Sequence, residues 1–244
     1  MNCLAIAQQP AAASGQATFK MRGGTAGMQQ GTVVSASPTG IKVRIGAQEI
    51  TLPPAMFESF QMAPPPEYRQ GYEAFTARDY PTALRLIKSV TDKYRGLPTD
   101  WAQYASGMLG DIYVGMNDFP SAEAAYNDFK RAYQTAGASS PTSEVGLARI
   151  AVARKDLAGA KARIDPITSE ALKQKSPPPT RALAYSQAFF VSGQVKEAQG
   201  NLPEALQDYL RTVTVFYHDP AAVAAAQERA DALRAAKTPP VTVP

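Results

Sequence analysis

The residues that carry most enzyme chemistry are scarce in this sequence. It has one cysteine, Cys3, and one histidine, His218, among 244 residues. Zinc sites, haem ligation and Ser-His-Asp catalysis each need several such side chains close together. Asp111 and Asp118 offer two carboxylates, but no nucleophile with a base and an orienting partner accompanies them. We therefore expect a non-enzymatic protein with no catalytic residues, no metal site and no cofactor.

The glycine-rich segment and the charge pattern argue against further ligand classes. The segment RGGTAG, residues 22–27, lacks the spacing of a dinucleotide fingerprint and the Lys-Ser/Thr ending of a phosphate-binding loop, which indicates a strand connection. The 25 basic and 21 acidic residues are interspersed and leave a net charge of +4, whereas nucleic-acid binding favours clustered positive charge. No run approaches the roughly 20 apolar residues of a membrane-spanning helix, so no transmembrane segment is expected.

The first residues leave two interpretations open. The tripeptide Ala5-Ile6-Ala7 matches the A-x-A pattern that signal peptidase cleaves after, although no basic stretch and no long apolar run precede it. Residues 1–16 are therefore either a signal-peptide remnant, which places the protein in the periplasm or cell envelope, or the disordered leader of a cytoplasmic protein. At the other end, residues 237–244 are expected to form a disordered tail.

Residues 17–62 alternate apolar and polar side chains, which indicates a small β domain. A meander of short strands with one apolar face predicts an SH3-like or Sm-like sheet or barrel. Its edge strands could pair with a second copy of the chain, which would make a homo-oligomer. Three prolines within residues 63–66 are expected to form a stiff linker. The four expected strands are Ala17–Met21, Gly31–Ser37, Gly40–Gly46 and Gln48–Leu52.

One short motif recurs four times after the prolines and marks turns between helices. Its copies are DYPTA, DFPSA, DLAGA and NLPEA, ending at residues 83, 122, 160 and 205. The first residue of each copy can cap a helix by accepting hydrogen bonds from free N–H groups, and the prolines suit a first helical turn. Small residues recur twelve positions before each final alanine, which predicts four antiparallel hairpins with close helix contacts. The pairs are Gly71/Ala83, Gly110/Ala122, Ala148/Ala160 and Gly193/Ala205.

The second copy carries the strongest likeness to a known family. Leu109-Gly110-x-x-Tyr113 followed by Ala122-x-x-x-Tyr126 resembles the L-G-x-x-Y and A-x-x-x-F pattern of tetratricopeptide repeats. The motif alanines are 39, 38 and 45 residues apart, against 34 in the family. The resemblance covers residues 67–236 and implies a mainly α solenoid of helical hairpins, ending in an Ala-rich capping helix.

The resemblance also implies a concave groove that binds a protein or peptide partner. The expected function is that of a non-enzymatic interaction scaffold or adaptor in a bacterial cell-envelope assembly. The first helix of each hairpin would supply the groove. In the family's register, the groove residues are Tyr68, Tyr72, Phe75, Tyr104, Asp111, Arg149, Phe190 and Gln194.

The alternative is an accessory protein that binds RNA or a ribonucleoprotein through an Sm-like N-terminal module. Four basic residues of the expected strands and their connection would then contact phosphates, although few aromatic residues accompany them. Outside these sets, Trp101 is expected to pack on the preceding helix. The four basic residues are Lys20, Arg22, Lys42 and Arg44.

Overall fold

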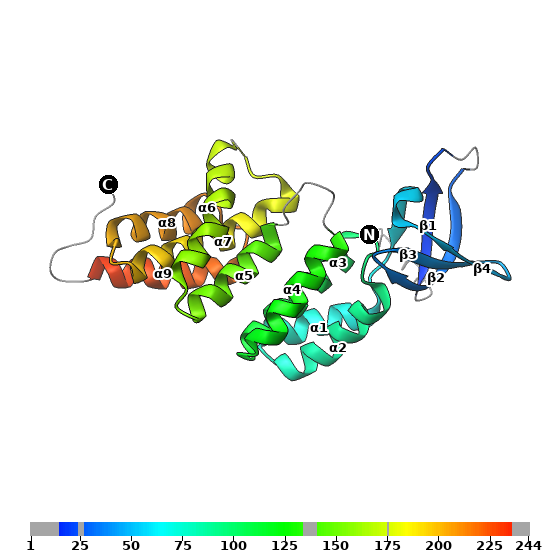
Figure 1. Ribbon diagram of the computed structural model, residues 1–244, viewed down its shortest axis with the longest axis horizontal. Helices are drawn as coiled ribbons and strands as arrows, with labels where there is room; N and C mark the ends of the chain where they lie inside the picture. The colour runs from blue at the N-terminus through cyan, green and yellow to red at the C-terminus, as the bar shows by residue number, and fades with distance from the viewer. Residues whose placement is uncertain (1–14, 24–26, 134–140, 175, 236–244) are drawn as a thin grey trace, which may run out of the picture. The chain divides into compact units, whose positions relative to one another are not determined.

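The computed structural model describes residues 15–23, 27–133, 141–174 and 176–235 (Figure 1). These residues form an antiparallel five-stranded sheet followed by nine α-helices. The expectation of a mainly α chain with a small N-terminal β domain is therefore confirmed. The chain divides into two compact units between Ile112 and Tyr113. Most of the predicted leader, including its A-x-A pattern, and all of the predicted tail lie outside the described residues.

The sheet has the strand order β4-β3-β2-β1-β5, with every neighbouring pair antiparallel. Alternation along the strands buries Phe19, Val33, Ile41 and Val43 on one face and leaves polar side chains on the other. The fifth strand, which follows a 3-10 turn, was not among the predicted ones. The strands are β1 Gln16–Met21, β2 Gln29–Ser37, β3 Gly40–Ile45, β4 Gln48–Leu52 and β5 Phe57–Met62.

The first helices share one hydrophobic core with the sheet. Helix α1 spans Pro66–Thr76, α2 spans Tyr80–Tyr94 and α3 begins at Asp100 and ends at Gly115. Ile87, Val90 and Tyr94 of α2 belong to the same buried cluster as the sheet residues. Gly96, with φ of 96°, lies against the β2–β3 turn, because an added Cβ would be 2.5 Å from the Ser37 carbonyl carbon. The sheet and these helices therefore fold as one packed body.

The second unit holds the remaining helices. Helix α5 packs against α6 and α7, and α7 packs against α8 and α9, so the α5–α6 hairpin contacts the α7–α8 hairpin. The last helix buries alanines at four-residue spacing, which suits a helix with one apolar stripe. The helices are α4 Phe119–Tyr133, α5 Pro141–Ala153, α6 Leu157–Lys173, α7 Pro179–Ala198, α8 Leu202–Thr214 and α9 Pro220–Ala235.

The four motif copies form four turns of one geometry. In the first three copies the aspartate side chain accepts a hydrogen bond from the backbone N–H three residues later, at 3.3, 3.2 and 2.8 Å. In every copy the first residue donates its own N–H to the carbonyl five residues earlier, at 2.9 Å, which is the Schellman arrangement. The residue before each cap has a positive φ: Arg78 60°, Asn117 59°, Lys155 62° and Gly200 81°.

The small residues predicted to bring helices together are buried, and the contact has a specific form. All four motif alanines have no exposed surface. A Cβ at Gly71 would lie 2.7 Å from Ile87 Cδ1, and one at Gly193 would lie 2.5 Å from Tyr209 Cε1. In both hairpins the large residue four positions after the alanine therefore packs directly onto the glycine of the other helix.

Candidate functional site

Two exposed tyrosines of the first unit, Tyr72 and Tyr104, and the half-buried Tyr68 form a patch, which we call the tyrosine face. Tyr68 and Tyr72 are four residues apart and so lie on one side of α1. The Tyr72 ring is 6.2 Å from the ring of Tyr104 on α3. Tyr72 is 41% exposed and Tyr104 is 38% exposed. Neighbouring aromatic side chains with this exposure offer apolar area to a partner.

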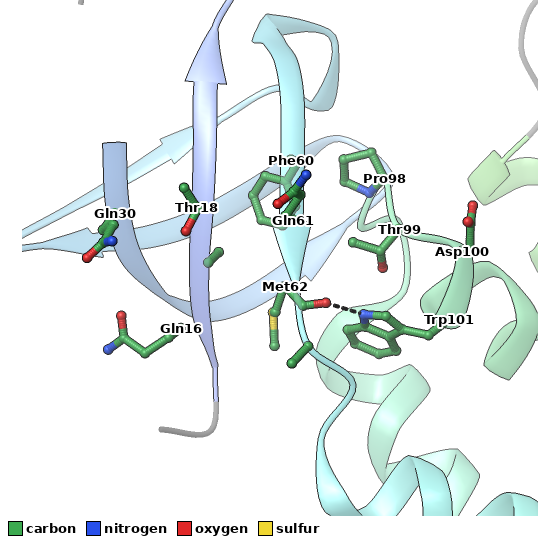
Figure 2. A pocket seen from close by; sticks show the side chains of 12 residues that line it. Gln16, Thr18, Gln30, Phe60, Gln61, Met62, Pro98, Thr99, Asp100 and Trp101 are labelled. Atoms are coloured by element: carbon green, nitrogen blue, oxygen red, sulfur yellow. Dashed lines mark hydrogen bonds between the residues drawn. The ribbon is translucent and has the colours of Figure 1, made fainter. Parts of the chain in front are cut away.

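Trp101 packs against Tyr68, one of the three residues of this face. Its ring lies 6.0 Å from Tyr68 and meets Tyr94 of α2 edge-on at 5.6 Å, so the expected packing on the preceding helix is confirmed. The indole Nε1 donates a hydrogen bond to the Met62 carbonyl at 2.8 Å (Figure 2). Burial raises the pKa of the Tyr68 hydroxyl, which keeps it a neutral donor. The ring of Tyr68 is therefore held against a fixed indole.

The other predicted groove residues divide between core contacts and scattered positions. The Phe75 ring lies 6.4 Å from Tyr80 and the Phe190 ring lies 5.9 Å from Tyr209, so both aromatic rings pack within their own hairpins. The structure thus brings together Tyr68, Tyr72 and Tyr104 of the predicted set. The half-buried polar members lie on separate helices: Asp111 on α3, Arg149 on α5 and Gln194 on α7.

Charged side chains of the second unit form partnered clusters that the sequence did not reveal. Glu144 accepts hydrogen bonds from Lys130 at 2.9 Å and Arg163 at 2.7 Å. Burial alone would raise the pKa of Glu144, but these two hydrogen bonds outweigh it and lower the pKa below 4.5. An anion held by two cations in this way stabilises the fold and stays ionised at neutral pH.

Most of the basic residues proposed for phosphate contact are partnered within the sheet. Lys20 pairs with Glu58 at 2.9 Å, and Glu49 pairs with Lys42 at 3.3 Å and Arg44 at 2.5 Å. Hydrogen bonds from Arg44 and Lys42 lower the pKa of Glu49. Because three of these four cations are paired with two carboxylates, the sheet presents less free positive charge to a nucleic-acid backbone than the sequence suggests.

In comparisons with known proteins, no family model matches the chain and no curated protein matches it. Among the described helices, none is long and apolar enough to cross a membrane. Within the same residues, no group of three His, Cys, Asp or Glu side chains is arranged to hold a metal ion.

Proposed function

We propose that the protein is a non-enzymatic adaptor, built from tetratricopeptide-like hairpins, that binds a peptide or a partner helix on its tyrosine face. The observation that carries the proposal is the adjacency of Tyr72 and Tyr104, which are both exposed and have their rings 6.2 Å apart. Tyrosine is enriched among the residues that dominate binding energy at protein interfaces. A rigid ring also loses little conformational entropy when a partner covers it.

Charged side chains next to the tyrosines on α1 suit a partner with both apolar and charged groups. Arg69 and Glu73 lie one helical turn apart beside the tyrosines on α1, with Nε and Oε1 4.0 Å apart. An exposed ion pair at this distance contributes little to stability, so both groups are available to polar atoms of a partner. An amphipathic peptide with one aromatic or aliphatic anchor fits these groups.

We further propose that the adaptor works in a bacterial cell envelope, as part of a larger assembly. This part rests on the Ala5-Ile6-Ala7 pattern in the sequence, which is typical of a signal-peptidase site. Fractionation of the native cells, followed by sequencing of the mature N-terminus, tests it. A chain that starts at Gln8 in the envelope fraction supports export, whereas a cytosolic chain that retains Met1 contradicts it.

The binding function can be tested with peptides selected on the purified protein from a random display library. A selected peptide should lose about thirtyfold in affinity for Tyr72→Ala or Tyr104→Ala, because truncating a central interface aromatic costs at least about 2 kcal/mol. Tyr217→Ala is the matched control, since Tyr217 is 61% exposed and lies in the loop between α8 and α9. Equal affinities of all three variants and the parent would refute the tyrosine face as the binding surface.

A further inference from the structure

An open cavity of about 1060 Å³ lies against the outer face of the sheet in the first unit (Figure 2). Its floor is a row of three side chains from adjacent strands, Gln30, Thr18 and Gln61, which are paired in register. Its wall is the segment Pro98–Trp101, which leads into α3. This volume is slightly above the usual range for small-molecule sites, roughly 300–1,000 Å³.

The lining of this cavity is polar but nearly uncharged. Only Asp100 carries a charge among the residues that line it, and no lysine or arginine does. Anions such as phosphates need positively charged or clustered N–H partners, so they are poor candidates. The side chains of the floor row make no hydrogen bonds to other described residues. Each glutamine amide can both donate and accept, which matches the hydroxyl groups of a neutral polyol.

The wall of the cavity adds the apolar surface of the Trp101 indole ring and contains Thr99, whose hydroxyl has no hydrogen-bond partner. The Trp101 indole is fixed by its hydrogen bond to the Met62 carbonyl and offers part of its ring toward the cavity. Thr99 is only 8% exposed, and its Oγ1 is the single buried side-chain polar atom of the described residues without a hydrogen-bond partner. Because this atom is closed off from solvent, a ligand in the open cavity would contact the indole ring rather than this hydroxyl.

We propose that this cavity binds a short, uncharged oligosaccharide. Sugar hydroxyls require partners that donate and accept, which the amides of Gln30 and Gln61 supply, and the C–H face of a pyranose packs on an aromatic ring. An extended peptide is the weaker candidate. A strand added to the free edge of β5 would need the Met62 carbonyl, which Trp101 already occupies.

The test uses the single tryptophan of the chain, which is Trp101 itself. The full-length protein is titrated with two neutral trisaccharides, maltotriose and N,N′,N″-triacetylchitotriose, while tryptophan fluorescence is recorded. We expect a saturable change with at least one of them, at an affinity that is the same in low and high salt because the ligand is uncharged. The absence of a saturable change with both sugars would overturn the proposal.

Substitutions in the floor of the cavity test whether the sugar binds there. Gln30→Ala with Gln61→Ala should weaken binding by at least about tenfold, because two hydrogen bonds are lost. Thr18→Val, which keeps the shape of the side chain, should weaken it by less. Gln48→Ala is the matched control, because Gln48 is an exposed glutamine of β4 that does not line the cavity. Unchanged melting temperatures show that the variants fold, and unchanged binding by the double variant would overturn the proposal. None of these changes touches the tyrosine face, so this test and the adaptor test can fail independently.

Discussion

Replacing Lys155 by glycine should stabilise the second unit, because Lys155 holds a backbone conformation that suits glycine. It has a φ of 62° at the turn between α5 and α6. For a residue with a Cβ, the left-handed conformation is less stable than the right-handed one by roughly 1–2 kcal/mol. Glycine avoids this penalty, but it loses about 0.4–1 kcal/mol more conformational entropy on folding. The net expectation for Lys155→Gly is a gain of about 0.5–1 kcal/mol in the free energy of unfolding.

Two further variants separate the backbone effect from the side chain. Lys155 is exposed and belongs to none of the ion pairs among the described residues. Lys155→Ala keeps the Cβ and should therefore change stability by less than about 0.5 kcal/mol. Gly200 occupies the equivalent turn before α8 with a φ of 81°, and nothing lies within 4 Å of an added Cβ there. Gly200→Ala should thus lower the free energy of unfolding by about 1 kcal/mol through backbone strain alone.

Urea unfolding followed by far-UV circular dichroism measures these differences. Tryptophan fluorescence cannot replace it, because Trp101 is the single tryptophan and lies in the first unit. The midpoint should shift while the slope with urea stays constant, which marks a change in stability without a change in the compactness of the unfolded state. The reasoning is refuted if Lys155→Ala stabilises as much as Lys155→Gly, or if Gly200→Ala leaves the midpoint unchanged.

Three other substitutions have defined outcomes. Gly193→Ala should destabilise by about 1–2 kcal/mol in urea unfolding, because the new methyl group would overlap the Tyr209 ring; unchanged stability would contradict this contact. Glu144→Gln should cost about 1 kcal/mol at pH 7. The pKa of Glu144 is lowered on folding, so its contribution is complete above 4.5 and lost as the pH falls through the folded pKa. The parent and the variant should therefore converge in acid unfolding, and a constant difference would contradict the ion cluster. Trp101→Phe removes the hydrogen bond to β5 and should destabilise the first unit by about 1 kcal/mol, measured by circular dichroism.

The helical hairpins could be predicted because the signals that form them are local. The capping aspartates lie three residues from the N–H groups that they accept from, and the small residues recur at a fixed distance from the motif. The left-handed residue before each cap was missed. Gly200 and Asn117 are residue types that favour that conformation, whereas Arg78 and Lys155 adopt it because the turn between two packed helices requires it.

The fifth strand and the cavity depend on contacts between distant parts of the chain. β5 pairs with β1, about forty positions earlier, and its apolar residues Phe57, Phe60 and Met62 do not alternate strictly. The cavity forms only where the outer face of the sheet meets the start of α3. Periodicity assigns Gln30 and Gln61 to the solvent face of a sheet, and it contains no information on which loop lies beside that face.

The fourth hairpin has a charge cluster where the second hairpin has a tyrosine, because Lys196 follows Gly193 at the same distance as Tyr113 follows Gly110. Lys196, at the tyrosine position, pairs with Asp208 of α8, which also accepts hydrogen bonds from Ser192 at 2.6 Å and Arg211 at 2.7 Å. The Asp208 side chain is only 1% exposed. Removing one partner of a buried pair typically costs roughly 3–5 kcal/mol, whereas replacing the whole set by apolar residues is often neutral. The lysine at this position of the fourth hairpin is therefore explained by Asp208 on the facing helix, and the two positions must be considered together.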